Sequence, residues 1–247
     1  MRKRQAIFRS IVQVILLFLV VLPVHAELQP PCPKVPPIAL DLPRFRAALA
    51  RSEPIIIVAF GSSSTEGSAA SDKAHSYPAI LQAVLSSLLP AAHIAVINRG
   101  IGGQDAAEEL VRIGRDVTAI RPQLVIWQIG ANAAIRNEDP GSFRSTVAAG
   151  VRRMKDGGSD VILMDNQRAR RVLEAPRRAA IEQALATVAH DSGGALFSRG
   201  ALMDAWAATG AAYERYLASD GLHHNDLGYR CVAMALADAI IAGLQAH

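Results

Sequence analysis

The stretch PIIIVAFGSSSTEGS, residues 54–68, passes from an apolar run into a turn that is rich in hydroxyl groups. The run PIIIVAF predicts a strand buried on both faces, because a strand with one face in water would alternate apolar and polar residues. Strands of that kind occur almost only in parallel sheets that are covered by helices. The stretch therefore predicts an α/β fold, and it raises the question of what so many hydroxyls do at the end of a buried strand.

Four further apolar runs are typical of strands in the same sheet. They are HIAVIN (93–98), QLVIWQI (123–129), DVILMD (160–165) and GALFS (194–198). Helical patterns separate them, at residues 77–89, 104–119, 142–156 and 176–191, and a long last helix is expected to begin at Asn225 or Asp226. The alternation predicts a three-layer αβα sandwich with a flavodoxin-like parallel sheet of about five strands. Ligands of such sheets bind at the carboxyl ends of the strands.

The N-terminus has the pattern of a secretory signal peptide, residues 1–26. Four basic residues precede or flank an apolar stretch, residues 11–22, and VHA ends at Ala26. Because that stretch is much shorter than the ~20 residues that span a membrane, we expect cleavage rather than a stable membrane anchor. The predicted organisation is this signal peptide, a Pro-rich lead-in (27–53) and one folded domain (54–247), in a periplasmic or secreted protein.

The excess of basic residues belongs to the predicted signal peptide. Residues 1–26 hold four of the 26 Lys and Arg residues and none of the 22 Asp and Glu residues, so the rest of the chain has no formal net charge. We therefore expect no nucleic-acid partner. The sequence carries no signal for an oligomeric state.

Two cysteines remain after residue 26, Cys32 in the lead-in and Cys231 in the last predicted helix. They are either two buried thiols or the halves of one disulfide. Because an even number of cysteines in an oxidising compartment favours pairing, we predict the disulfide.

The loops at the strand ends do not match other common ligand-binding motifs. The first turn lacks the Gly-Lys-Ser/Thr ending of a phosphate loop, and GIGGQD has Asp105 where a dinucleotide fingerprint needs its third glycine. Asn132 could simply cap a turn. Asp220, His223 and His224 could ligate a metal, but no further cluster at ligand spacing completes such a site. We expect no metal and no cofactor.

Taken together, these loops resemble the SGNH hydrolases, also called the GDSL esterase and lipase family. The matching blocks, between about residues 54 and 243, are Gly61-x-Ser63-x-Thr65-x-Gly67, Asn98-x-Gly100-x-x-Gly103, Gly130-x-Asn132 and Asp220-x-x-His223. The resemblance implies that Ser63 is the nucleophile, with His223 as its base and Asp220 as the acid of the triad. It also implies an oxyanion hole built by Gly103 and Asn132.

Two positions depart from the family's pattern. Ser62 replaces the Asp that usually precedes the nucleophile, and Ala133 replaces the Asp that often follows the Asn of the third block. In the family these carboxylates are supports rather than members of the triad. The departures leave the subfamily and the substrate open rather than the chemistry.

The same chemistry follows from the side chains themselves. A serine hydroxyl is a weak nucleophile until a base takes its proton, and a neutral imidazole can do so near neutral pH. Asp220 stands three residues before His223, so its carboxylate can fix the ring through Nδ1 while Nε2 faces Ser63. The amides of Ser63 and Gly103 and the side chain of Asn132 would bind the oxyanion.

The sequence thus predicts a serine esterase that acts on small-molecule or glycan esters with short acyl groups. A carbohydrate or cell-wall O-acetylesterase is the narrower alternative, and a ligand-binding module without turnover is the alternative of another class. NQRARRVLEAPRR, residues 166–178, carries five arginines after the fourth strand. They indicate either an anionic substrate or, as we expect, a solvated helix face.

Overall fold

Five parallel strands form one sheet in the computed structural model, which describes residues 31–246. The predicted signal peptide and the first four residues of the lead-in lie outside the described residues. The strands are β1 (Ile55–Gly61), β2 (Ile94–Gly100), β3 (Leu124–Gln128), β4 (Asp160–Met164) and β5 (Ala195–Phe197), in the order β2-β1-β3-β4-β5. This is the flavodoxin-like order, so the predicted fold class is confirmed.

The register brings the carboxyl ends of β2, β1 and β3 to one level. Gly61 at the end of β1 pairs with Gly100 of β2 on one side and with Gln128 of β3 on the other. The chain leaves β1 toward one edge of the sheet and returns to β3 on the other side, so the strand order reverses between β1 and β3. Ligand crevices form at such a reversal.

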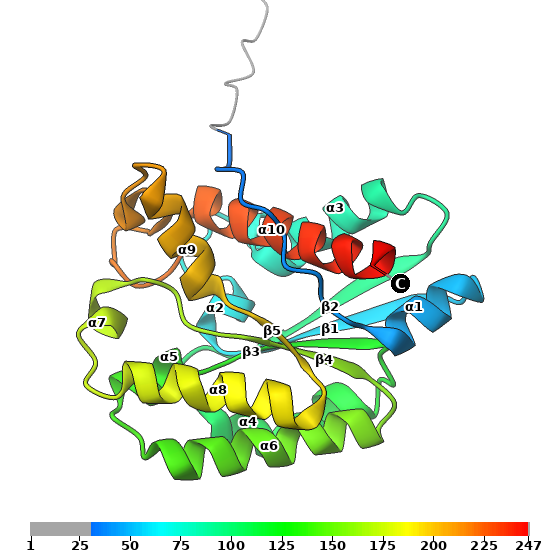
Figure 1. Ribbon diagram of the computed structural model, residues 1–247, viewed down its shortest axis with the longest axis horizontal. Helices are drawn as coiled ribbons and strands as arrows, with labels where there is room; N and C mark the ends of the chain where they lie inside the picture. The colour runs from blue at the N-terminus through cyan, green and yellow to red at the C-terminus, as the bar shows by residue number, and fades with distance from the viewer. Residues whose placement is uncertain (1–30, 247) are drawn as a thin grey trace, which may run out of the picture.

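Helices cover both faces of the sheet (Figure 1). One face carries α1 (Pro43–Ala50), α3 (Tyr77–Leu88), α9 (Arg199–Ala208) and α10 (Asp226–Gln245), and the other carries α4 (Ala106–Ile113), α6 (Pro140–Asp156) and α8 (Arg178–Ser192). Three short helices, α2 (Ser63–Glu66), α5 (Ala131–Ile135) and α7 (Arg170–Leu173), follow the carboxyl ends of β1, β3 and β4. The predicted three layers are therefore present.

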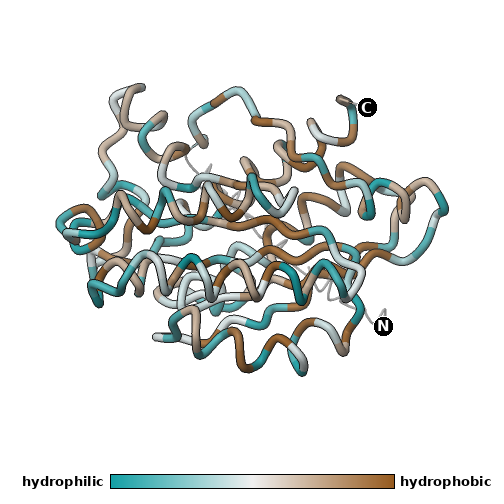
Figure 2. The backbone as a smooth tube through the Cα atoms, turned by 60° about the horizontal axis from the view of Figure 1, so that its bottom comes forward, coloured by the Kyte–Doolittle hydropathy of each residue, from teal (hydrophilic) through white to brown (hydrophobic). Residues whose placement is uncertain are grey.

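The three inner strands β1, β3 and β4 are buried because each one supplies side chains to both hydrophobic cores, whereas the edge strand β2 is only partly buried. Along β1, Ile57 and Ala59 belong to the core beneath α3 and α10, whereas Val58 and Phe60 belong to the core beneath α4 and α6. All four are fully buried. In Figure 2 the tube is brown, the colour of hydrophobic residues, where the chain runs through the middle of the molecule.

Most predicted helices are present, and the differences have local causes. The pattern over 104–119 ends as an α-helix at Ile113 and continues as a π-helical turn, Gly114–Thr118. Two helices of the sandwich were not predicted. The helix α1 begins at Pro43, within the predicted Pro-rich lead-in, and α9 begins with Arg199 and Gly200, where no apolar repeat marks a helix.

The lead-in is fastened along α10. The structure contains the predicted disulfide between Cys32 and Cys231. Farther along, the Leu40 amide donates to the Ala239 carbonyl at 3.3 Å, and Gly243 lies so close to Leu40 that no side chain would fit between them. By length and composition α10 could cross a membrane, but 56% of its most apolar window is buried in this core.

Candidate active site

The hydroxyl-rich turn after β1 presents one serine and buries its neighbours. The side chains of Ser62 and Thr65 both donate to Oε1 of Gln128, at 3.3 and 3.2 Å, and so fasten the turn to β3. Ser64 is buried. Ser63 begins α2, and it is the serine of this turn whose hydroxyl faces the loop before α10.

Three of the predicted residues form a continuous chain of hydrogen bonds. Oγ of Ser63 lies 2.8 Å from Nε2 of His223, and Nδ1 of the same ring lies 2.6 Å from Oδ2 of Asp220. The other oxygen of Asp220 accepts from the amides of Leu222 and His223, at 2.9 and 3.0 Å. Partial burial opposes ionisation of Asp220, but these hydrogen bonds outweigh it and lower its pKa. The carboxylate can therefore orient the ring and stabilise its protonated form.

The neighbouring His224 has a different role. It is fully buried, and its ring nitrogen Nδ1 donates to the Tyr216 carbonyl at 2.9 Å. Burial, together with the positive charge of Arg199, lowers the pKa of His224 to about 3, so the ring stays neutral. Residues 31–246 contain no group of three or more His, Cys, Asp or Glu side chains that could hold a metal.

Two of the predicted oxyanion donors are main-chain amides, those of Ser63 and Gly103. Within residues 31–246, the N–H groups of Ser63 and Gly103 have no hydrogen-bond acceptor. Gly103 has a φ of +79°, a conformation that side chains disfavour, and a Cβ added there would meet open space. Asn132 uses one side-chain N–H on the Gln104 carbonyl, at 2.7 Å, which leaves the second one available. The three predicted donors thus come from the loops after β1, β2 and β3.

A buried arginine that we did not predict connects these loops. The guanidinium of Arg112, on α4, donates to the carbonyl of Gly61 at 2.9 Å, to the carbonyl of Arg99 at 2.8 Å and to Oε1 of Gln104 at 2.6 Å. It also lies 4.2 Å above the ring of Phe60. The signal for it in the sequence is weak: Arg112 stands three residues after the buried Glu109, on the face of α4 that packs inward.

Three more contacts hold the end of β2 and the loop after it against their neighbours. Nδ2 of Asn98 donates to the Thr65 carbonyl at 2.7 Å, and Gly100 touches the Glu66 main chain so closely that only glycine fits. Farther along the loop, the Arg136 guanidinium donates to the Gly103 carbonyl at 2.6 Å. The glycine and asparagine of the second predicted block therefore have a structural role beside α2.

The five arginines of residues 166–178 do not form a common surface. Arg168 is buried and pairs with Glu182 and Asp204, at 2.7 and 2.8 Å. Arg170 pairs with Glu174 and Arg178 with Glu182. For Arg168, the expectation of a solvated helix face was wrong, because this residue is part of a buried ion-pair network.

Comparison with known proteins gives a family and a fold. The model of the non-GDSL lipase-like family matches residues 32–246. The first block of the chain agrees with that description, since it reads Gly-Ser-Ser-Ser rather than Gly-Asp-Ser-Leu. No curated protein sequence matches the chain.

Solved structures share the fold at low sequence identity. A two-domain esterase (CEX) active on acetylated mannans aligns with a TM-score of 0.67 at 22% identity, over 81% of this chain and 52% of that one. An acetylxylan esterase from Geobacillus stearothermophilus, Axe2, aligns with a TM-score of 0.62 at 20% identity, over 74% and 92% of the two chains. A lipase/acylhydrolase from Enterococcus faecalis aligns with a TM-score of 0.62 at 22% identity, over 74% and 93%. The chain spans about half the length of the two-domain esterase.

Proposed function

The chain belongs to the non-GDSL lipase-like family and is a hydrolase, and we propose that it is an exported serine esterase that cleaves carboxylic esters through an acyl-enzyme. The family membership agrees with the resemblance to the SGNH hydrolases. The proposal assigns Ser63 as nucleophile, His223 as general base and then acid, and Asp220 as the residue that orients the ring. It assigns the oxyanion hole to the amides of Ser63 and Gly103 and to the side chain of Asn132.

The first half of the reaction follows from these assignments. Oγ of Ser63 attacks the ester carbonyl carbon while Nε2 of His223 takes the hydroxyl proton. The carbonyl oxygen becomes negative and is bound by the three N–H donors, whose hydrogen bonds strengthen as the charge develops. When the tetrahedral intermediate collapses, the alcohol leaves with the proton that His223 returns, and the acyl group stays on Ser63.

Water completes the cycle by the same groups. His223 takes a proton from a water molecule, whose oxygen attacks the acyl carbon. When the second tetrahedral intermediate collapses, His223 returns that proton to Oγ of Ser63, and the carboxylic acid leaves. Asp220 remains ionised throughout and stabilises the imidazolium in both halves. The observation that supports this scheme most directly is the unbroken hydrogen-bond chain from Ser63 through His223 to Asp220.

The preferred substrates in this proposal carry short acyl groups, and acetylated carbohydrates are the narrower candidate. The observation in favour of the narrower one is that two structures of the same fold are described as acting on acetylated mannans and as an acetylxylan esterase. At 20–22% identity that likeness bears on fold rather than on substrate. A direct assay has to distinguish acetylated carbohydrates from other esters of short acyl groups.

The test combines labelling with an ester panel. A fluorophosphonate should label the protein irreversibly at Ser63, and p-nitrophenyl esters should be hydrolysed with kcat/KM falling as the acyl chain lengthens from acetyl. Acetylated xylan and mannan, run beside the panel, decide whether release of acetate from a glycan exceeds that from the small ester. A protein that binds these compounds but is neither labelled nor able to turn over any ester would be a binding module instead.

A further inference from the structure

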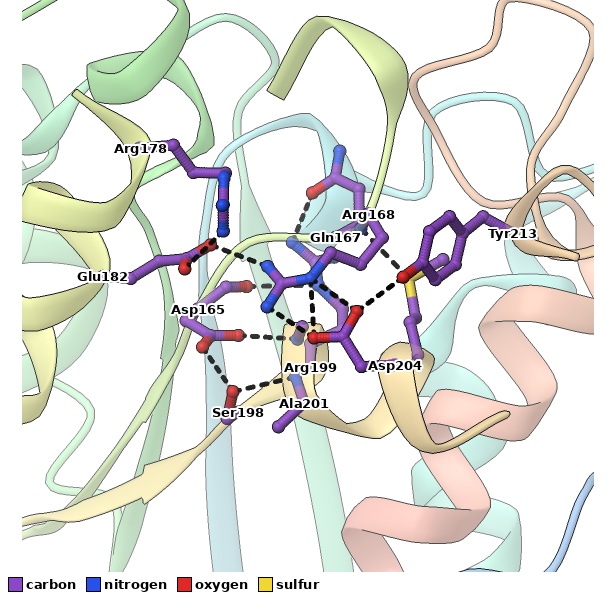
Figure 3. Close-up of polar contacts among 12 residues, drawn as sticks. Asp165, Gln167, Arg168, Arg178, Glu182, Ser198, Arg199, Ala201, Asp204 and Tyr213 are labelled. Carbon is purple, nitrogen blue, oxygen red and sulfur yellow. Dashed lines mark hydrogen bonds and ion pairs between the residues drawn. The ribbon is translucent and has the colours of Figure 1, made fainter. Parts of the chain in front are cut away.

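A fully buried polar segment follows β4 and lies behind the loop that carries His223. Residues 165–168 are each 9% exposed or less, although all four are polar or charged. Burying such side chains is costly unless they are hydrogen-bonded. Figure 3 shows three of them, Asp165, Gln167 and Arg168, among the side chains that surround Arg199.

Gln167 is the member of this segment that reaches the catalytic loop. Its Nε2 donates to the Leu222 carbonyl at 2.9 Å, and Leu222 immediately precedes His223. This hydrogen bond attaches the peptide before His223 to the segment that follows β4.

Arg199 determines which way that amide points. Nη2 of Arg199 donates to Oε1 of Gln167 at 2.7 Å, and Nε of the same guanidinium donates to the Asp165 carbonyl at 3.1 Å. Because a guanidinium carries only donors, the amide oxygen has to face Arg199, and the amide N–H then has to face Leu222. If the amide were flipped, its NH₂ group would face the N–H donors of Arg199, and its oxygen would face the Leu222 carbonyl oxygen.

The segment has further attachments that keep Gln167 in place. Asp165 accepts from the hydroxyl of Ser198 at 2.6 Å and from the amide of Gly200 at 2.9 Å, so it is fixed to the start of α9. On the other side, Arg168 makes three hydrogen bonds to Asp204. Gln167 therefore projects from a rigid support.

We infer that Gln167 is a positioning residue for the esterase reaction: its amide, oriented by Arg199, holds the Leu222 carbonyl and thereby keeps the His223 ring at Ser63. The inference rests on the proposed function, since it concerns the reactivity of that serine. A shift of the ring by a fraction of an ångström would lengthen the bond to Oγ and slow both proton transfers.

The substitution Gln167→Glu separates positioning from stability. A carboxylate still accepts from Arg199, and forms an ion pair with it, but it has no hydrogen to donate to the Leu222 carbonyl and repels that oxygen. We expect a folded protein with a melting temperature close to that of the wild type. The second-order rate constant for fluorophosphonate labelling should fall about 10-fold or more, and kcat should fall with KM little changed.

Controls make each outcome decisive. Gln183→Glu makes the same change on the exposed face of α8, where the side chain contacts Thr187, and should label at the wild-type rate. The final extent of labelling measures how much of the protein is folded. The rate constant measures how reactive Ser63 is in the folded protein. If Gln167→Glu proves unstable, Gln167→Met, which loses the same donor without adding charge, is measured in the same way.

The results separate this inference from the proposed function. If the wild type is labelled and Gln167→Glu or Gln167→Met is labelled equally fast, Gln167 does not position His223 and the inference is overturned. If the wild type itself is neither labelled nor active on any ester, the proposed function fails first. A slower rate at full labelled fraction supports the inference.

Discussion

The carboxyl group of Glu109 gives a prediction about stability that can be worked out from its surroundings. The side chain is fully buried beneath β3, where Oε2 accepts from the indole N–H of Trp127 at 2.6 Å. Its other oxygen has no hydrogen-bond partner among the described residues. Burial raises the pKa of Glu109 from 4.5 to about 8, against the opposing effects of the Trp127 hydrogen bond and the Arg112 charge. The group is therefore protonated in the folded protein at neutral pH.

The sign of the pH dependence follows from that shift. Between pH 4.5 and about 8 the folded protein keeps the proton and the unfolded chain does not, so stability falls as the pH rises. The contribution is fully present below pH 4.5 and is lost above about 8. At about 1.4 kcal/mol per pH unit, the loss between pH 5 and pH 8 is on the order of 3 kcal/mol.

The substitution Glu109→Gln should remove this dependence. Glutamine has nearly the shape of the protonated acid and keeps an acceptor for Trp127, but it cannot ionise. We expect the variant to be close to the wild type in free energy of unfolding at pH 5 and to exceed it by on the order of 3 kcal/mol at pH 8. Urea unfolding followed by far-UV circular dichroism at both pH values measures the difference.

A matched variant controls for the change of charge. Glu174→Gln removes an exposed carboxylate that pairs with Arg170 and should leave the pH dependence of stability unchanged. If Glu109→Gln showed the same decline from pH 5 to pH 8 as the wild type, the carboxyl would have to be ionised or hydrated in the folded protein. The burial argument would then be wrong.

Three further predictions concern the site and the disulfide. Ser63→Ala should lower kcat for the hydrolysis of p-nitrophenyl acetate by roughly 10⁴-fold or more in a folded protein, and Ser64→Ala should not. The reverse pattern would show that Ser64, and not Ser63, is the nucleophile. Asn132→Ala should cost about 10² to 10³ in kcat with little change in KM, whereas a change confined to KM would make it a substrate-binding residue. Replacing Cys32 and Cys231 by Ser should lower the free energy of unfolding by up to about 5 kcal/mol, and unchanged stability in denaturant would contradict the expected chain-entropy effect.

The strands and the candidate triad could be predicted because their signals are local. An apolar run such as residues 54–60 specifies a doubly buried strand without knowledge of its neighbours, and all five predicted strands lie within a residue or two of the observed ones. Ser63, Asp220 and His223 were assigned from the resemblance of short sequence blocks to the SGNH hydrolases, and the chemistry of their side chains agrees with that assignment. The structure brings them into one hydrogen-bonded chain.

The residues that hold the site could not be predicted, because their burial depends on tertiary contacts. Gln167 and Arg168 stand in an arginine-rich segment that reads as a solvated surface, yet both are buried by α8 and α9. The helix α9 itself was missed, since its buried face amounts to little more than Met203 and Trp206. A polar residue in the interior has no local pattern that distinguishes it from the same residue in water.

Two of the unpredicted residues, Arg112 and Arg199, solve the same structural problem on opposite faces of the sheet. Main-chain carbonyls at the carboxyl ends of the strands, or just after them, accept hydrogen bonds from these guanidinium groups. Arg112 binds those of Gly61 and Arg99, and Arg199 binds that of Asp165. A planar guanidinium with five donors can bind several such oxygens at once, which an apolar side chain of the same size cannot do.

That arrangement costs stability, because burying a charge is unfavourable and an apolar replacement often folds at least as well. Arg199 in particular is fully buried, and it donates hydrogen bonds to two neutral oxygens, the main-chain carbonyl of Asp165 and the amide oxygen of Gln167. Such a residue instead fixes the path of the main chain whose carbonyls it binds. The serine, the proposed oxyanion donors and the histidine come from segments after β1, β2 and β3 and before α10. The geometry of the site therefore depends on the buried arginines and on the amides that they orient.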